Sequence, residues 1–239
     1  MSERLIRPGI GIYSRVEAAR LLRMTPPRLR RWVGGYTYWL RDSAAEKSRR
    51  KRPPVIKTDL PVIDDAIALS FLELMELRVV KVIVDAGVSL QHVRIAAQLA
   101  SSRFETDHPF ASRRVFTDGQ AIFSAITDDL ERPDVVRWKK EDIDQIIAGP
   151  LFDQFLQEIE FDSTTSLARR WWPRGRNCPI LLDPKISFGA PVIAGTAVRT
   201  SVVARMAHRA SVHATAIAFE LQLQQAEAAL AFESELAAA

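Results

Sequence analysis

The N-terminal segment of this chain constrains the fold most, because its residues mark where two short helices begin and end. Ser14 and Glu17 have the spacing of a capping box, in which a hydroxyl and a carboxylate together cap the start of a helix. Thr25 followed by Pro26 marks the start of a second helix, and a glycine pair ends it. Two short helices joined by about three residues predict a helix-turn-helix.

Both predicted helices have an apolar side that would face a core. In the first helix the apolar residues are Val16, Ala18, Ala19, Leu21 and Leu22. In the second helix the apolar residues are Leu29, Trp32 and Val33, and the basic residues are Arg28, Arg30 and Arg31. A short, arginine-rich second helix is typical of the recognition helix that enters the major groove of DNA.

The segment after the second helix predicts a hairpin beside it. Tyr36, Tyr38 and Leu40 alternate with other residues as a strand requires, and Val55 with Ile56 could supply the returning strand. The basic residues expected at the tip are Lys47, Arg49, Arg50, Lys51 and Arg52. Such a tip would lie on phosphates while the helix enters the groove.

The charge of the chain is unevenly distributed. Residues 1–57 contain 15 Lys and Arg against 4 Asp and Glu, whereas the remainder contains 18 basic and 25 acidic residues. A basic head on an acidic body is expected of a protein that binds nucleic acid. Charge alone is equally compatible with a solvated, partly disordered head, and the helix-turn-helix pattern favours DNA binding.

The sequence YSRVEAARLLRMTPPRLRRWVGGY resembles the opening of MerR-like regulators, in which a Leu-Arg pair recurs in the second helix. Leu29 and Arg30 stand at that pair, so the resemblance implies that Arg30 contacts the DNA backbone. The aromatic residue that usually follows this pair in the family is replaced here by Arg31. The tip of the hairpin, which is called the wing in this family, is also unusually long. We expect the DNA contacts to come from Arg15, Arg28, Arg30, Arg31, Tyr36, Lys47, Arg49 and Arg50.

The middle of the chain predicts further helices. An apolar-rich helix is expected from Asp64 to about Ala86, ended by Gly87, and Ser89 would cap the next helix. The first is so apolar that it must be covered, by its own core or by a second copy in a homodimer. A hairpin is expected over residues 115–127, a helix near 141–147, and a strand or helix end over 151–162.

Catalytic and metal-binding residues are not expected. The carboxylates Asp128, Asp129, Asp142 and Asp144 are interpreted as solvated charges, and the four histidines have no metal-ligand spacing. We therefore predict that the protein is not an enzyme and needs no cofactor. A single cysteine, no signal peptide and no apolar run of membrane-spanning length lead us to expect a cytoplasmic protein.

A basic connector precedes the alanine-rich C-terminal helices, which are expected over about 201–207, 211–220 and 223–236. Residues 163–211 contain eight Lys and Arg but only one carboxylate, Asp183. Arginine and tryptophan often dominate interfaces, so the connector fits an acidic protein partner. Alternatively, its two tryptophans pack in the core. The connector residues expected to bind the partner are Arg169, Arg170, Trp171, Trp172, Arg174 and Arg176.

The sequence DPKISFGAPVIAGTAVRTSVV is similar to the domain-of-unknown-function family 433, over roughly residues 178–233. The matching positions are Pro184, Ile186, Gly189, Pro191, Val192, Ile193, Gly195 and Thr196. Ala197 and Arg209 depart from the family's usual arginine and glycine. Members of that family are antitoxins encoded beside PIN-type ribonuclease toxins, whose carboxylates hold Mg²⁺.

The joined layout resembles VapB-type antitoxins. We therefore predict a mainly helical α+β protein with a winged-helix DNA-binding domain over 1–60, a helical and hairpin region over 61–165, and a toxin-binding domain over 166–239. The resemblance implies neutralisation of a PIN-type toxin and repression of the protein's own promoter. The alternative is a MerR-like regulator that senses a small ligand or a protein and has no toxin partner.

Overall fold

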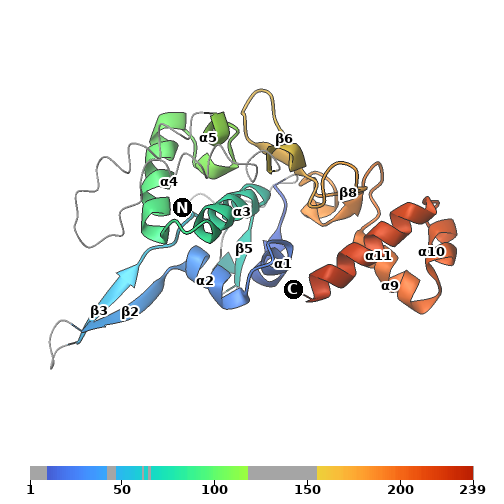
Figure 1. Ribbon diagram of the computed structural model, residues 1–239, viewed down its shortest axis with the longest axis horizontal. Coiled ribbons are helices and arrows are strands. Elements are labelled where there is room, and N and C mark those ends of the chain that lie inside the picture. Colours follow the sequence, from blue (N-terminus) through green and yellow to red (C-terminus); the bar gives the residue numbers. More distant parts are fainter. Residues whose placement is uncertain (1–9, 42–46, 61, 64–65, 118–154, 239) are drawn as a thin grey trace.

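The computed structural model describes residues 10–41, 47–60, 62–63, 66–117 and 155–238. The described part is mainly helical with small antiparallel sheets, which confirms the predicted fold class. Figure 1 shows the N-terminal elements around α3, a hairpin that projects from them, and three C-terminal helices at the opposite end. Among the helices that the structure describes, none combines the length and apolarity that crossing a membrane would need.

The two N-terminal helices form where the capping residues predict. The first helix, α1 (Arg15–Leu21), has both hydrogen bonds of the capping box, since Ser14 Oγ accepts from the Glu17 amide and Glu17 Oε2 accepts from the Ser14 amide. The second helix, α2 (Pro26–Gly34), has Thr25 at its N-cap and ends before Gly35, whose φ is 68°. Their predicted apolar residues are buried, except that Val16 is 51% exposed.

The hairpin after α2 differs from the prediction in its second strand. It consists of β2 (Tyr36–Arg41) and β3 (Lys47–Arg52), which pair antiparallel. The basic run is therefore the returning strand and not the tip, because its side chains can pair with aromatic residues on β2. Val55 and Ile56 are instead buried beneath α2, where the Val55 amide donates to the Trp32 carbonyl at 2.7 Å.

The central helix begins later than the apolar pattern predicts. Residues expected in the helix form β5 (Ala66–Leu69), which lies between β1 (Tyr13–Ser14) and β4 (Val62–Ile63) in a small sheet. The helix α3 (Phe71–Asp85) starts at a capping box made by Ser70 and Glu73. A capping serine and backbone pairing to β1 thus override the continuous apolar pattern.

The remaining elements of the central region pack on α3. Helix α4 (Leu90–Phe104) is capped by Ser89 as predicted, and η1 (Pro109–Ala111) and α5 (Arg114–Thr117) follow. Because residues 115–117 are helical, the start of the predicted hairpin is wrong. The rest of that hairpin, the helix near 141–147 and the four aspartates lie outside the described residues.

The C-terminal region contains two short hairpins and then three helices. Strand β6 (Ile159–Phe161) pairs with β7 (Ala168–Trp171), and β8 (Ile180–Leu181) pairs with β9 (Val192–Ile193), with η2 (Ser187–Gly189) between them. The helices are α9 (Thr200–Arg209), α10 (Val212–Ala218) and α11 (Leu223–Ala238), as predicted. Buried residues from Tyr13 to Phe232 form one continuous core.

Candidate functional site

Helix α2 presents an exposed arginine to solvent. Leu29, Trp32 and Val33 are buried on its inner side, so the arginines of the same helix occupy the outer side and the flanks. Arg30 is exposed, and no side chain in the described part of the chain pairs with it. Among the described residues its guanidinium has no ion-pair partner, and its planar set of N–H donors suits an external anion such as a phosphate.

Arg28 and Arg31 are held by neighbouring residues. Arg28 Nη2 lies 2.6 Å from Asp85 Oδ1 on α3, and its guanidinium lies 4.7 Å from the ring of Trp32. Arg31 lies 4.2 Å from the ring of Tyr36. Arg28 thus fastens α2 to α3, whereas the Arg31 contact joins α2 to the first residue of β2.

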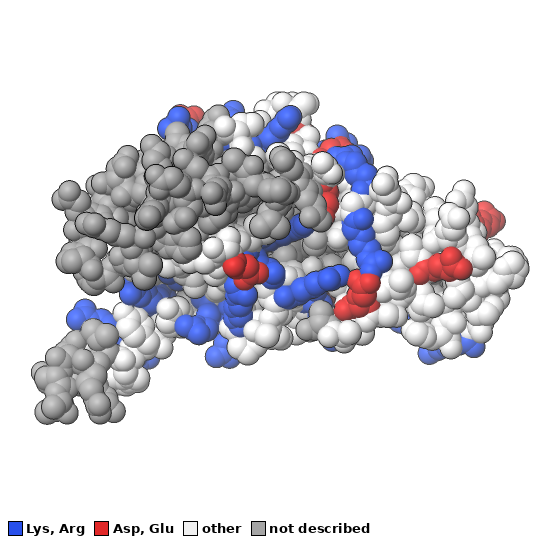
Figure 2. All heavy atoms as spheres, in the orientation of Figure 1, with Lys and Arg blue, Asp and Glu red and all other residues white. Residues whose placement is uncertain are grey.

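The other predicted DNA contacts lie on α1 and the hairpin. Arg15 begins α1 and is half-exposed. Lys47 begins β3, and Arg49 and Arg50 are exposed on opposite faces of the same strand. Figure 2 shows Lys and Arg side chains along the edge formed by α2 and α1, with few Asp or Glu side chains among them.

The predicted protein-binding connector is already paired within the chain. Arg170 Nε lies 2.7 Å from the buried carboxylate of Asp183 and its Nη1 lies 3.3 Å from Glu160, so its pKa is raised, chiefly by the hydrogen bond to Asp183. Arg174 forms an ion pair with Glu235 on α11. Glu160 is brought to Arg170 by the pairing of β6 with β7, and Glu235 lies far along the chain from Arg174. Neither partner could be located from its distance along the sequence.

The two tryptophans of the connector have different surroundings. Trp171 is 3% exposed and belongs to the core, as the alternative interpretation expected, so its ring offers no surface to a partner. Trp172 is half-buried and lies 4.3 Å from the guanidinium of Arg176. Arg176 also donates to the carbonyls of Gln157 and Ile159. The outward-facing part of the connector is therefore Trp172, Arg176 and Arg169.

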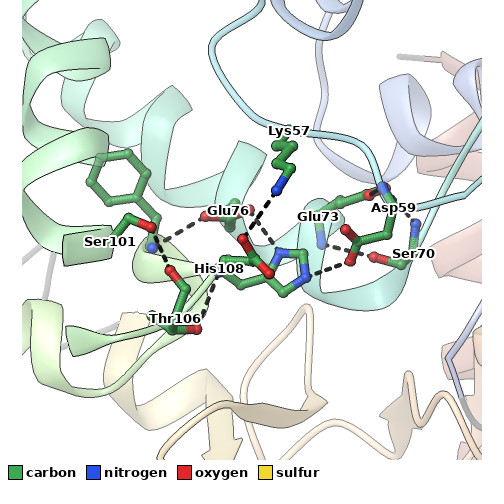
Figure 3. A network of polar contacts seen from close by, with 10 residues as sticks. Lys57, Asp59, Ser70, Glu73, Glu76, Ser101, Thr106 and His108 are labelled. Atoms are coloured by element: carbon green, nitrogen blue, oxygen red, sulfur yellow. Dashed lines mark hydrogen bonds and ion pairs between the residues drawn. The ribbon is translucent and has the colours of Figure 1, made fainter.

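A buried polar network between α3 and η1 was not predicted from the sequence. His108 Nδ1 lies 3.1 Å from Glu76 Oε2, and His108 Nε2 lies 2.6 Å from Asp59 Oδ2 (Figure 3). Burial alone would lower the pKa of His108, but Glu76 and Asp59 outweigh it and raise the pKa to about 9. Glu73 links the network to the capping box by accepting from the Asp59 and Ser70 amides.

This network joins separate segments of the chain to one another. Both ring nitrogens of His108 face carboxylates of the same chain, and the residue is 7% exposed. Within the described residues, no group of three or more His, Cys, Asp or Glu side chains is arranged to bind a metal ion. The spacing of Ser70 and Glu73 was the one sequence signal that could have located part of the network.

A pocket of about 340 Å³ lies where the N-terminal elements meet the C-terminal region. It is lined from one side by α1 and from the other by η2 and α11, and its wall is mixed in polarity. Its charged lining residues are Glu17, Arg20, Arg199 and Glu233. Its volume is at the lower end of the range of small-molecule sites.

The chain is similar in sequence to a known protein. The chain is 26% identical over 209 residues to a Mycobacterium tuberculosis protein named "Putative antitoxin VapB45", covering 83% of each protein. The likeness is to an antitoxin. No model of a known protein family matches the chain.

A solved structure shares the fold. The crystal structure of Rv2018 from Mycobacterium tuberculosis matches with a TM-score of 0.69 at 22% identity, covering 94% of this chain and 100% of that one. The two proteins therefore share a fold over nearly all of this chain.

Proposed function

We propose that this protein is an antitoxin that neutralises a ribonuclease toxin of the PIN type and represses its own promoter. The observation that carries the proposal is the similarity to an antitoxin over 83% of both chains. We assign DNA binding to the basic head and neutralisation to the C-terminal region, so the proposed function uses both ends of the chain. The chain acts by binding and not by catalysis.

Neutralisation is assigned to the C-terminal region from about residue 166. A PIN-type active site holds Mg²⁺ with carboxylates, so a basic segment can cover it. In the connector, Arg169, Trp172 and Arg176 face outward, while Arg170 and Arg174 keep the segment in shape through Asp183 and Glu235. In the proposed toxin-binding segment, Arg169 and Arg176 form the contact surface, and Arg170 and Arg174 hold the segment in its conformation.

Inhibition of the toxin tests this assignment. The neighbouring gene product would be purified and its ribonuclease activity titrated with the wild-type chain and with a variant carrying Arg169→Gln and Arg176→Gln. We expect the wild type to inhibit and the variant to need at least about tenfold more protein, a loss typical of interface arginines. Undiminished inhibition by a folded variant would remove the connector from the interface, and a wild type that never inhibits would refute the antitoxin proposal.

DNA binding is assigned to the head, over residues 1–60. Arg30 is exposed on α2 and has no ion-pair partner among the described residues, and residues 1–57 contain 15 basic residues against 4 acidic ones. Each phosphate contact releases counterions, so binding should weaken steeply as salt rises. DNA-binding proteins of this kind read paired half-sites, so the proposed repressor is a homodimer, which light scattering at micromolar concentration can test.

A gel-shift titration on the promoter fragment tests the head. Arg30→Ala should weaken binding to every duplex, because a backbone contact carries no sequence information. Arg28→Ala should have a second effect, since losing the pair with Asp85 also loosens α2 from α3. An affinity for DNA that changes neither with salt concentration nor with Arg30→Ala would refute the assignment of DNA binding to the head.

A second candidate function is regulation by a small ligand without a toxin. The pocket of about 340 Å³ between head and tail favours it, because a ligand there would contact α1 and α11 together. The neighbouring gene distinguishes the candidates. A small carboxylate-rich ribonuclease supports the antitoxin, and a gene without such a product supports the ligand-controlled regulator.

A further inference from the structure

The two faces of the β2–β3 hairpin differ in what covers them. In an antiparallel pair, directly opposed residues place their side chains on the same face. Tyr36 opposes Arg52 and Tyr38 opposes Arg50, whereas Trp39 opposes Arg49 and Thr37 opposes Lys51. The aromatic tyrosines and the tryptophan therefore lie on opposite faces of one narrow ribbon.

The tyrosine face is turned toward the protein. The rings of Tyr36 and Tyr38 have centroids 6.1 Å apart, Arg31 of α2 lies 4.2 Å from Tyr36, and Arg52 lies 5.5 Å from Tyr38. Both tyrosines and Arg52 are half-buried. The Arg31 contact joins the start of the hairpin to α2, and the other two contacts link residues within the hairpin, so the tyrosine face has an internal role.

The tryptophan face is open along its described length. Thr37, Trp39, Arg49 and Lys51 are all exposed, and the Trp39 side chain is 66% exposed. A tryptophan this exposed contributes nothing to a core and exposes a large apolar surface to water. On β3, Arg49 lies directly opposite Trp39 and Lys51 lies opposite Thr37, and the sequences of β2 and β3 contain no Asp or Glu.

We propose that this tryptophan face, defined by Thr37, Trp39, Arg49 and Lys51, contacts the sugar-phosphate backbone of duplex DNA. The proposal rests on the DNA-binding function assigned to the head. Arg49 and Lys51 bind phosphates, and the ring of Trp39 packs against the sugars between them. Trp39 was not among the residues that the sequence singled out, because alternation along a strand does not reveal which face the protein covers.

Charge and spacing favour DNA over a protein partner. Residues two apart on a strand are separated by about 6.8 Å, which spans two steps of about 3.4 Å along one DNA strand. Arg49 and Lys51 can thus reach phosphates two steps apart on that strand, and their combined charge would repel a basic partner. A tryptophan beside cations also suits an acidic protein surface, which is the competing occupant that the experiment must detect.

The test compares three variants of the full-length chain in gel shifts on the promoter fragment and on an unrelated duplex of equal length. Trp39→Ala should weaken binding about tenfold and leave the salt slope unchanged, because an apolar contact releases no counterion. Arg49→Ala should weaken binding and lower the slope by about one. Arg103→Ala is the charge control: it removes an exposed arginine from α4, outside the residues expected to bind DNA, and should cost at most about twofold.

The outcomes separate this inference from the function on which it rests. A wild-type chain that binds no duplex overturns both. A wild-type chain that binds DNA while a folded Trp39→Ala chain binds equally well overturns the tryptophan face alone. Loss of toxin inhibition by Trp39→Ala, with DNA binding unchanged, would assign the face to a protein partner and also overturn the inference. Circular dichroism establishes folding, which an exposed residue such as Trp39 should not disturb.

Discussion

His108 is a buried side chain whose charge is stabilised by two carboxylates of its own chain. Glu76 lies on α3 and Asp59 lies on the segment that follows the hairpin, so one imidazolium joins the central helix, η1 and that segment. Burial raises the pKa of Glu76, and the hydrogen bond from His108 opposes that rise. His108 and Glu76 thus stabilise each other's charge in a buried position.

The pKa of His108 predicts how stability depends on pH. The pKa rises from 6.5 in the unfolded chain to about 9 in the folded one, so the folded state retains a proton that the unfolded state loses. This contribution is fully present below pH 6.5 and is lost as pH rises through about 9. We expect the free energy of unfolding, measured in urea, to fall by an amount on the order of 3 kcal/mol between these limits.

Replacement of the histidine checks the origin of that fall. His108→Gln should lower stability at pH 6.5 and should flatten the loss between pH 6.5 and 9. His92→Gln is the control, because burial lowers the pKa of His92 and confines its titration to lower pH. If His108→Gln loses stability with pH as steeply as the wild type, His108 is not the group responsible.

At the scale of one element, β7 places two neighbouring arginines in different surroundings. Arg169 is exposed, with Glu160 at 3.7 Å, and Arg170 pairs with Asp183, whose side chain is 3% exposed. Strand alternation separates the two side chains, and β8 and the loop after it supply the buried carboxylate. The same residue type therefore forms an outward surface at one position and an internal bridge at the next.

The difference within β7 predicts unequal costs for the same substitution. Arg170→Gln should lower the free energy of unfolding by about 3 kcal/mol, because it leaves the buried Asp183 without its charge partner. Arg169→Gln should cost less than about 1 kcal/mol, as exposed ion pairs do. Chemical denaturation of both variants measures this difference, and equal costs would show that Asp183 does not depend on Arg170.

At the scale of the whole molecule, two hydrogen bonds, a close contact and an ion pair join the N-terminal elements to the C-terminal region. The buried Tyr13 hydroxyl donates to the Gly189 carbonyl at 2.7 Å, and the Ile12 amide donates to the Phe188 carbonyl at 3.0 Å. A Cβ added to Gly189 would collide with Tyr13 Oη and lie 2.9 Å from its Cζ. Arg23 on the head also pairs with Glu235 on α11 at 2.7 Å.

The contact between Tyr13 and Gly189 predicts that replacing Gly189 costs more stability than replacing another glycine of similar φ. Gly189 has a φ of 85° and Gly195 a φ of 82°, but a Cβ at Gly195 would meet no atom within 4 Å. Gly195→Ala should therefore cost about 1 kcal/mol of stability through backbone strain alone, and Gly189→Ala about 3 kcal/mol or more. Thermal unfolding of the two variants compares them directly, and matching losses would show that Tyr13 yields without cost.

The sequence alone determined the elements whose signals are local. Capping residues located the starts of α1, α2 and α4, and glycine ended α2. The three C-terminal helices followed from their composition, with Ser211 capping α10. Each of these signals acts over a few residues, so no knowledge of distant parts was needed. The clustering of positive charge at the head was equally visible, because charge is a sum over the chain.

Only the tertiary structure decided which residues face outward and which pair with each other. Strand pairing moved the basic run from the expected tip into β3 and turned Trp39, not Tyr36, toward solvent. Packing brought Glu160, Asp183 and Glu235 to arginines that had no nearby carboxylate in the expected arrangement. These contacts join residues up to 61 positions apart or across a strand pair, and their energies depend on burial, which a linear pattern does not specify.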